Sequence, residues 1–397
     1  MASRGLPIIG VVGAGTMGSG IAQLALEHGH EVVIHDIDET AIERGRERIR
    51  EGLVKRALKL GLDADSTDDW VDGRLARLRQ AETIAGLGGE IDVAIEAAIE
   101  DLELKQDVFR ALDASAARDA ILATNTSALS VAVIASATSR PQRVVGLHFF
   151  NPAPVMPLVE VVAAPRTAQR VVVRAAALVQ GWGKTAVLST DSAGFIVNRV
   201  NRAFTLEALA MLERGEAGVA SIDEAVRAAG YPMGPFELMD LIGVDVNLAV
   251  ARALWEGFGR AERFRPSPIQ ERLVAEGRLG RKSDAGFYAY DAGRRGEPYE
   301  SLGEGPLEAN AIVDRLELAI VAEAYRALHD EVASEPDIDL ALRLGAGHPR
   351  GPFERVRAWG GASTVRDRLA ALERFGPRFA APAGLVAATP VARKGTG

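Results

Sequence analysis

One histidine and one glutamate, 160 − 148 = 12 residues apart, carry the chemistry that the sequence indicates most clearly. His148 ends a strand-like run at 143–148, and Glu160 is a lone charge inside the apolar run 158–162. A carboxylate in such a run needs a polar partner, and an imidazole at a neighbouring strand end can supply it. The carboxylate would fix the imidazole tautomer and stabilise its protonated form. The other ring nitrogen could then accept the proton of an alcohol.

His148 and Glu160 also have a plainer interpretation, in which each has only a structural role. A histidine at a strand end is often structural, and a lone glutamate can be the charge of an edge strand. Prolines at positions 152, 154 and 157 exclude a helix in between and predict a stiff crossing loop. Whether the pair forms therefore depends on the strands on either side of this loop.

Oxidation of an alcohol also removes a hydride, which needs an acceptor. The start of the chain has a motif that could bind such an acceptor. A β-rich run at 8–12 leads directly into the segment Gly13-Ala14-Gly15-Thr16-Met17-Gly18. Gly13 permits a tight turn, Gly15 lets a pyrophosphate approach the backbone, and Gly18 lets a helix and a strand pack closely. The N-terminus of the helix that follows offers N–H groups to phosphates.

Asp36 ends the next expected strand, 36 − 18 = 18 residues after the last glycine. A carboxylate there accepts hydrogen bonds from the adenine ribose and repels a 2′-phosphate, which favours NAD over NADP. A glycine-rich turn without a ligand is the alternative, but the strand context and the acidic strand end favour a dinucleotide site. The residues that we expect to bind NAD are Gly13, Gly15, Thr16, Met17, Gly18 and Asp36.

Further strand-like runs alternate with helical stretches along the first half of the chain. Three of these runs end at Glu96, Asn125 and His148. The alternation predicts an α/β doubly wound (Rossmann) domain with a parallel sheet over residues 1–190. Ligands of such sheets bind beyond the carboxyl ends of the strands, so these three polar residues are expected at the functional edge.

A basic stretch interrupts this domain between about residues 40 and 80. Its plainer interpretation is a solvated helix face. The sharper one is an inserted helical hairpin whose side chains contact a phosphorylated small molecule. Lys55 and Lys59 are four residues apart and would share one face of a helix.

The second half of the chain predicts helices and a repeat. Long Ala/Leu/Glu-rich stretches replace the strands after residue 191. Glu207 recurs as Glu323 and Gly234 as Gly351, with offsets of 323 − 207 = 116 and 351 − 234 = 117. Such a period indicates an internal duplication. We expect all-α C-terminal domains at 191–291 and 306–386.

Composition excludes several classes of function. A formal net charge of −8 does not suit a protein that wraps nucleic acid. The absence of cysteine excludes disulfides and thiolate catalysis and fits the cytoplasm, the localisation that we expect. Glycines at 10, 13 and 15 break the apolar run after Arg4, so neither a signal peptide nor a membrane span is expected. We also expect no metal.

Several of these segments together resemble the 3-hydroxyacyl-CoA dehydrogenase family. The matching motifs run in order over roughly three quarters of the chain, from about Gly10 to Tyr290. They are 125–127 (Asn-Thr-Ser), 148–152 (His-Phe-Phe-Asn-Pro), 158–161 (Leu-Val-Glu-Val), 194–199 (Gly-Phe-Ile-Val-Asn-Arg) and 231–238 (Tyr-Pro-Met-Gly-Pro-Phe-Glu-Leu).

The resemblance implies an enzyme of fatty acid metabolism, such as β-oxidation, that oxidises (S)-3-hydroxyacyl-CoA reversibly with NAD. His148 would be the general base and Glu160 its partner, while Ser127 and Asn198 would hydrogen-bond the 3-oxygen or thioester carbonyl of the substrate. The residues implied to line the cofactor are Glu96, Lys105 and Asn125. In the basic hairpin, only Lys55 matches a CoA contact of the family.

The resemblance also bears on the repeat. Single-copy relatives pair two chains through the helical domain, so a covalent second copy could take the partner's place. The expected state is a homodimer, or a monomer with an internal pseudo-dimer of helical domains. Arg199 recurs as Arg315, whereas Asn198 is replaced by Asp314, so the active site is expected at the first copy.

Two other functions remain as alternatives on this scaffold. One is an NAD-dependent dehydrogenase that acts on another hydroxy acid. The other is a non-catalytic, crystallin-like NAD-binding protein. The presence of His148, Glu160, Ser127 and Asn198 argues against the second alternative.

Overall fold

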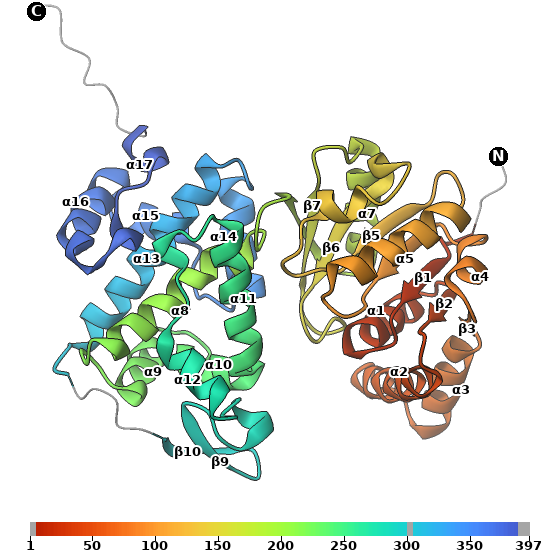
Figure 1. Cartoon of the computed structure of the whole chain (residues 1–397). Helices are drawn as coiled ribbons and strands as arrows, with labels where there is room; N and C mark the ends of the chain where they lie inside the picture. The colour runs from red at the N-terminus through yellow and green to blue at the C-terminus, as the bar shows by residue number, and fades with distance from the viewer. Residues whose placement is uncertain (1–4, 300–304, 388–397) are drawn as a thin grey trace, which may run out of the picture. The chain divides into compact units, whose positions relative to one another are not determined.

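The chain forms two compact units, Met1–Ser192 (unit 1) and Ala193–Gly397 (unit 2), in a computed structural model that describes residues 5–299 and 305–387 (Figure 1). Unit 1 contains an eight-stranded sheet in the order β3-β2-β1-β4-β5-β6-β7-β8. Its strands are β1 (Ile9–Val12), β2 (Val32–His35), β3 (Leu78–Gln80), β4 (Val93–Glu96), β5 (Ile121–Thr124), β6 (Val144–Phe149), β7 (Leu158–Ala163) and β8 (Thr185–Thr190).

Helices cover both faces of this sheet. Alternate strand residues such as Val11 and Ile95 pack with α1 and α7 in one apolar core. On the opposite face, Gly10 lies against Leu87 and Ile91. The helices of unit 1 are α1 (Thr16–Glu27), α2 (Glu39–Lys59), α3 (Ala64–Leu75), α4 (Ile84–Gly88), α5 (Leu102–Ser115), α6 (Val131–Ala135), the 3-10 turn η1 (Pro141–Arg143) and α7 (Gln169–Gly181). The predicted doubly wound α/β fold is confirmed.

The last two strands differ from the rest of the sheet. Strands β3, β2, β1, β4, β5 and β6 are parallel, but β7 is antiparallel to β6, and β8 is parallel to β7. Only 158 − 149 − 1 = 8 residues connect β6 with β7. A parallel return needs a crossover of about a dozen residues or more, so this short, proline-rich loop permits only a reversal.

Along the chain, two helices, α2 and α3, connect β2 with β3. Asp38 caps α2 by accepting a hydrogen bond from the Thr40 amide at 2.9 Å, and Asp63 caps α3 through the Ser66 amide at 2.9 Å. One side of α2 is buried in the core of unit 1, and the polar residues of the helix lie on its other sides. The buried positions of α2 are Ile42, Gly45, Ile49, Leu53 and Ala57.

The described residues of unit 2 form helices and a two-stranded hairpin, β9 (Tyr288–Asp291) and β10 (Arg294–Pro298). Its first part contains α8 (Val197–Glu213), α9 (Val219–Ala228), α10 (Pro235–Ile242), α11 (Val244–Gly257), η2 (Glu262–Phe264), α12 (Pro268–Ala275) and η3 (Arg281–Ser283). Its second part contains α13 (Ala309–His329), α14 (Glu335–Gly345), α15 (Pro352–Ala358), α16 (Ala362–Leu372), η4 (Glu373–Phe375), η5 (Pro377–Phe379) and α17 (Ala383–Ala387).

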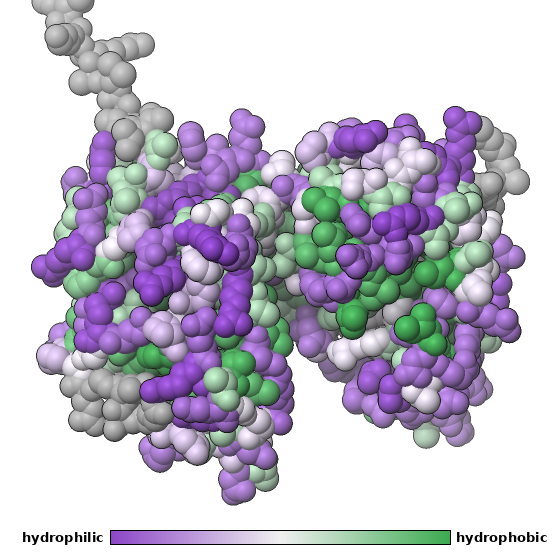
Figure 2. Space-filling view, in the orientation of Figure 1, coloured by the Kyte–Doolittle hydropathy of each residue, from purple (hydrophilic) through white to green (hydrophobic). Residues whose placement is uncertain are grey.

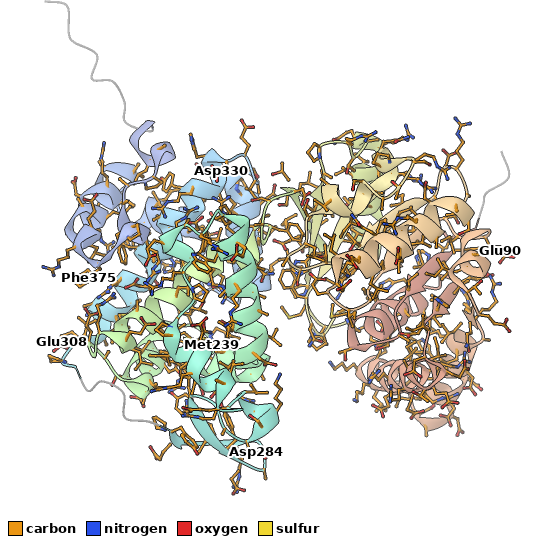
Figure 3. The ribbon with its side chains drawn as sticks, in the orientation of Figure 1. Glu90, Met239, Asp284, Glu308, Asp330 and Phe375 are labelled. Carbon is orange, nitrogen blue, oxygen red and sulfur yellow. The ribbon has the colours of Figure 1, made fainter. Side chains whose placement is uncertain are left out.

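Helices α8 and α13 exchange reciprocal ion pairs. Arg199 donates from Nε to Glu323 at 2.9 Å, and Arg315 donates from Nε to Glu207 at 2.6 Å. Both pairs join matching positions, because 315 − 199 and 323 − 207 are both 116. Arg199 also binds Asp330, which Figure 3 labels at the end of α13, at 2.6 Å. Such exchange is the signature of an approximate twofold relation between two elements.

Figure 2 shows hydrophilic side chains over much of the visible face, with smaller apolar areas between them. Within the described ranges, none of the helices is both long and apolar enough to cross a bilayer. The same residues contain no cluster of three or more acidic or histidine side chains that could hold a metal ion.

Candidate active site

Strands β6 and β7 place His148 and Glu160 opposite each other. The two residues are paired in the antiparallel register, and His148 Nδ1 lies 2.6 Å from Glu160 Oε2. Both side chains are buried; Glu160 has no exposed surface and His148 is 5% exposed. A carboxylate only accepts hydrogen bonds, so Nδ1 carries the proton and Nε2 is the basic nitrogen of the neutral ring.

The pleat of the two strands determines which face the pair occupies. The neighbours Phe149, Val159 and Val161 belong to the apolar core with α1 and α7. Successive residues of a strand point to opposite faces, so His148 and Glu160 project on the other side of the sheet, at the end of β6. The two apolar strands thus carry one buried polar pair, whose members hydrogen-bond each other.

The glycine turn after β1 has the shape of a phosphate cradle. Gly13 has φ +102°, and a Cβ there would lie 2.7 Å from the Ala97 carbonyl oxygen. A Cβ at Gly18 would lie 1.8 Å from the Gly13 carbonyl oxygen. At Gly15, by contrast, the space is open, and no side chain caps the helix that begins at Thr16. The first amides of α1 therefore meet no capping side chain, which fits a dinucleotide pyrophosphate.

Asp36 follows β2 beside this turn. Its carboxylate accepts hydrogen bonds from the Ala14 amide at 2.8 Å and from the Asp38 amide at 3.2 Å. The turn lies where the sheet order reverses between β1 and β4, the usual position of a dinucleotide. These residues fit NAD, because a partly exposed carboxylate beside the cradle can accept from a ribose hydroxyl.

The turn that follows β5 is joined to β6 and to a glutamate. Asn125 Oδ1 accepts a hydrogen bond from the Phe149 amide at 2.8 Å, next to His148. Glu100 accepts from the Thr126 hydroxyl at 2.6 Å and from the Ser127 amide at 2.9 Å. Burial favours the protonated form of Glu100, but Lys105 and these hydrogen bonds keep the pKa of its carboxyl below the ordinary value. Asn125 and Ser127 are thereby held beside the end of β6.

Glu96 and Lys105 form a buried ion pair under this turn. Lys105 Nζ lies 2.7 Å from Glu96 Oε1 and 3.3 Å from Glu100. The Thr124 hydroxyl donates to the other Glu96 oxygen at 2.7 Å. Lys105 is 1% exposed and Glu96 is fully covered by protein, so the pair supports the turn from inside.

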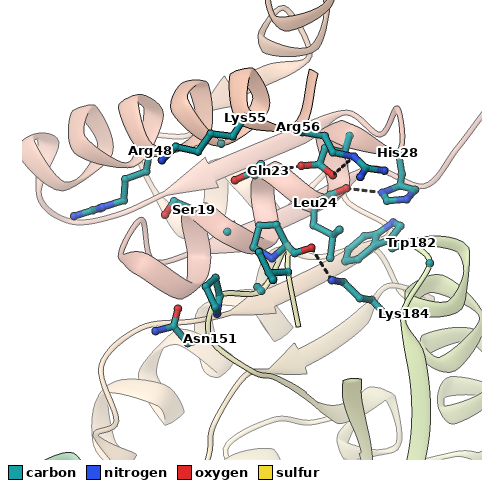
Figure 4. A pocket seen from close by; sticks show the side chains of 18 of the residues that line it. Ser19, Gln23, Leu24, His28, Arg48, Lys55, Arg56, Asn151, Trp182 and Lys184 are labelled. Atoms are coloured by element: carbon teal, nitrogen blue, oxygen red, sulfur yellow. Dashed lines mark hydrogen bonds and ion pairs between the residues drawn. The ribbon is translucent and has the colours of Figure 1, made fainter. Parts of the chain in front are cut away.

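A groove of about 690 Å³ lies between α1, α2 and the loop that follows β6 (Figure 4). Its cationic side chains come mainly from α2. They are Arg48, Lys55, Arg56, Lys59 and Lys184, against the two carboxylates Glu27 and Glu51. Lys55 is highly exposed and lies 3.9 Å from Glu51. Asn151 and Pro152, just beyond the end of β6, line the opposite wall.

Asn198 belongs to unit 2, where it is the second residue of α8. The other predicted site residues lie in unit 1, which brings together His148, Glu160, Asn125 and Ser127 at the end of β6.

Two residues of unit 1 went unnoticed in the sequence. Glu100 holds the turn that contains Ser127, and Lys184 contacts the loop that follows His148. Glu100 directly precedes the helix-capping Asp101, so a charge at that position looks ordinary. Lys184 contacts only carbonyl oxygens, which no sequence pattern marks.

Comparison with known proteins agrees with this geometry. The model of the 3-hydroxyacyl-CoA dehydrogenase NAD-binding domain matches residues 8–192, and the model of the C-terminal domain matches residues 194–290 and again 312–386. The chain is 36% identical to the 3-hydroxyadipyl-CoA dehydrogenase of Escherichia coli K12, over 89% of this chain and 90% of that protein.

Two further relatives differ in how much of the chain they cover. The mitochondrial hydroxyacyl-coenzyme A dehydrogenase of Sus scrofa is 40% identical and covers 70% of this chain, with 90% of its own length aligned. A crystal structure of 3-hydroxybutyryl-CoA dehydrogenase from Escherichia coli K12 superposes with a TM-score of 0.86 at 33% identity, and the match covers 97% of this chain and 98% of that one. The chain belongs to the 3-hydroxyacyl-CoA dehydrogenase family.

Proposed function

We propose that the protein interconverts (S)-3-hydroxyacyl-CoA and 3-ketoacyl-CoA with NAD. The observation that carries this proposal is the 2.6 Å contact between His148 and Glu160 at the end of β6. In a family of NAD-dependent dehydrogenases, a buried imidazole held by a carboxylate has the arrangement that an alcohol oxidation needs.

In the oxidation, His148 accepts the hydroxyl proton at Nε2 while the C3–H bond breaks. When bound at the glycine turn, NAD⁺ would supply the acceptor for the hydride that leaves C3. Glu160 keeps the imidazole in the productive tautomer and stabilises the imidazolium that forms. In the reverse direction, the imidazolium returns the proton to the oxygen of the ketone.

Ser127 and Asn198 are proposed to hydrogen-bond the 3-oxygen or the thioester carbonyl of the substrate. Support for Ser127 comes from Glu100, which holds its amide at 2.9 Å. Asn125 is proposed to line the cofactor. For Glu96 and Lys105, burial favours an indirect contribution, in which the pair supports the Asn125–Ser127 turn from below.

The proposed NAD site consists of the glycine turn and the start of α1. The pyrophosphate would contact amides at Gly15, Thr16 and Met17, while Gly13 and Gly18 allow the close backbone contacts of the turn. Asp36 would accept hydrogen bonds from the adenine ribose and disfavour NADP.

The groove beside α2 is proposed to hold the phosphates of CoA. It has five cationic side chains against two carboxylates, which suits a polyanion. Lys55 is proposed to contact one phosphate from α2. The loop at 151–157 forms the other wall of the groove and follows β6, the strand that carries His148.

The second helical copy is proposed to replace a partner subunit. The reciprocal ion pairs between α8 and α13 support this, because one interface joins matching residues in both directions. We expect a monomer of 42.1 kDa in sedimentation equilibrium. A dimer would contradict this part of the proposal. The cytoplasm is the proposed location, since the chain has no cysteine to oxidise.

The test of function is NADH consumption with a panel of substrates. We expect turnover of acetoacetyl-CoA, and the panel should include a thioester with a terminal carboxylate, because the two Escherichia coli relatives are named for different acyl groups. Turnover of a free 3-hydroxy acid with no turnover of any acyl-CoA would favour the alternative dehydrogenase. Binding of NADH without any turnover would favour the non-catalytic alternative.

A further inference from the structure

Lys184 connects the groove to the loop that follows the catalytic strand. It directly precedes β8, and its ammonium donates to the carbonyl oxygens of Pro154 at 3.0 Å and Met156 at 2.8 Å. The residue is 8% exposed and lines the groove. Figure 4 shows its side chain reaching the loop from the side opposite α2, close to Trp182.

Lys184 is a buried cation without a counter-ion in the described part of the chain. The two hydrogen bonds to neutral carbonyl oxygens are its polar contacts there, and its nearest charged influences are Glu27 and Arg56. Glu27 is already engaged by Gln23 at 2.7 Å and by Arg56 at 3.7 Å. Burial lowers the pKa of the Lys184 ammonium to about 8. An ammonium in this state is unfavourable unless an anion joins it, because charge burial needs compensation.

The position of Lys184 fits a phosphate of CoA better than the pyrophosphate of NAD. The pyrophosphate of NAD would lie at the N-terminus of α1, whereas the groove continues along α1 to Glu27 and His28. A helix of 12 residues spans about 18 Å, so the two ends of α1 cannot serve the same pyrophosphate. The loop that Lys184 holds begins just after His148, where the acyl-CoA must pass.

We infer that Lys184 binds a phosphate of the CoA moiety and couples that phosphate to the 151–157 loop. Two of its N–H groups hold the loop carbonyls, and the third is directed to the ligand, which supplies the missing counter-ion. This inference rests on the proposed acyl-CoA substrate. Lys184 thereby contacts the nucleotide part of the substrate and takes no part in the proton transfer at His148.

The test compares acetoacetyl-CoA with acetoacetyl-pantetheine, which lacks the nucleotide phosphates. For Lys184→Met, we expect KM for acetoacetyl-CoA to rise roughly 10- to 100-fold, the range for losing a hydrogen bond between charged groups. We expect kcat to stay within about threefold and KM for the pantetheine thioester to rise far less than KM for acetoacetyl-CoA, since both thioesters lose the two loop hydrogen bonds but only acetoacetyl-CoA loses a phosphate contact. Arg110→Gln removes an exposed cation from α5 and serves as the control for net charge.

Two further measurements separate binding from a loop that is merely held in place. With the wild type, KM for acetoacetyl-CoA should rise above pH 8, where the Lys184 ammonium loses its proton. In Lys184→Arg, which stays charged, KM should be flat over the same range. An equal loss with both thioesters in Lys184→Met, or an identical pH profile in Lys184→Arg, would overturn the inference.

Failure of the proposed function has a different outcome. If the wild type turns over neither thioester, titration calorimetry with CoA still measures the site. Weaker CoA binding by Lys184→Met than by wild type would then support the inference without the activity. Equal CoA affinity of the two proteins would contradict it. Thermal melting of each variant in buffer alone verifies that the compared proteins are folded.

Discussion

Glu160 lies directly across the strand pair from His148, and its carboxylate oxygen is 2.6 Å from Nδ1. This relation depends on the reversal between β6 and β7. An antiparallel register places two side chains on the same face at the same level, which allows a hydrogen bond between strands. The orientation of the imidazole is thus set by the sheet itself.

Replacing Glu160 with glutamine should therefore impair chemistry more than binding. The amide can still accept the Nδ1 hydrogen bond, but it does not stabilise an imidazolium. We expect kcat to fall roughly 10²- to 10⁴-fold, the usual contribution of general acid–base catalysis, with little change in KM. Steady-state kinetics with acetoacetyl-CoA and NADH measures this. Glu90→Gln, an exposed glutamate of unit 1 (Figure 3), is the matched control and should behave as wild type.

Changing Asp36 to asparagine should alter the choice of cofactor. The amide oxygen can still accept from the Ala14 amide, so the turn is kept. Without the charge, a ribose hydroxyl is bound less tightly and a 2′-phosphate is no longer repelled. We expect KM for NAD to rise roughly tenfold and the preference for NAD over NADP to shrink by a larger factor. An unchanged preference would remove Asp36 from the cofactor site.

The reciprocal ion pairs of unit 2 predict a matched pair of stability losses. Glu207 has no exposed surface and receives Arg315, Arg214 and Arg378, so Glu207→Gln removes the buried carboxylate that these three arginines share, although Glu216 still pairs with Arg315 and Arg214. We expect a loss of about 3 kcal/mol in the free energy of unfolding. Glu323→Gln should cause a similar loss, measured by urea denaturation.

The exposed Glu271→Gln serves as the control for these two variants. It should change the free energy of unfolding by less than about 0.5 kcal/mol. A loss confined to only one of the two buried glutamates would contradict the symmetric relation.

A buried histidine in the second copy predicts how stability depends on pH. His348 is covered on all sides, and burial, with a smaller effect of Arg355, lowers its pKa from 6.5 to about 3. Its pKa is lower in the folded state than in the unfolded state, so protonation favours unfolding. The stabilisation is present above pH 6.5 and is lost as the pH falls toward 3. By pH 5 the loss amounts to about 2 kcal/mol.

His348→Gln isolates this contribution. The glutamine loses ring contacts with Tyr231 and Phe204, so this variant should be less stable at every pH. The informative quantity is the slope of the free energy of unfolding against pH. Between pH 7 and pH 5, the free energy of unfolding of the wild type should fall toward that of the variant. Parallel pH curves would show that His348 does not titrate on unfolding.

The fold and much of the site could be predicted because they follow from local patterns. Gly13 and Gly18 are required by contacts within one strand–turn–helix unit, and the motif shows this directly. The register between His148 and Glu160 required one more fact, the direction of β7. The loop of eight residues implied that direction, yet a count of alternating elements alone favours a parallel strand.

The rest of the site depends on contacts between distant residues of ordinary type. Lys105 reads as a surface helix lysine, but the folded chain buries it against Glu96 and Glu100. Lys184 lies 30 residues after Pro154, whose carbonyl oxygen it binds. Backbone acceptors carry no residue signature, so these partners became visible only in the structure.

The most direct test of the central claim is hydride transfer measured in a single turnover, started by mixing the enzyme–NADH complex with saturating acetoacetyl-CoA. It compares wild type, His148→Ala, and the double variant His148→Ala/Glu160→Gln. We expect His148→Ala to slow the step roughly 10²- to 10⁴-fold, and the double variant to be no slower, because Glu160 acts only through the imidazole. If His148→Ala transfers hydride at the wild-type rate, or if the two losses multiply, the assigned chemistry is contradicted.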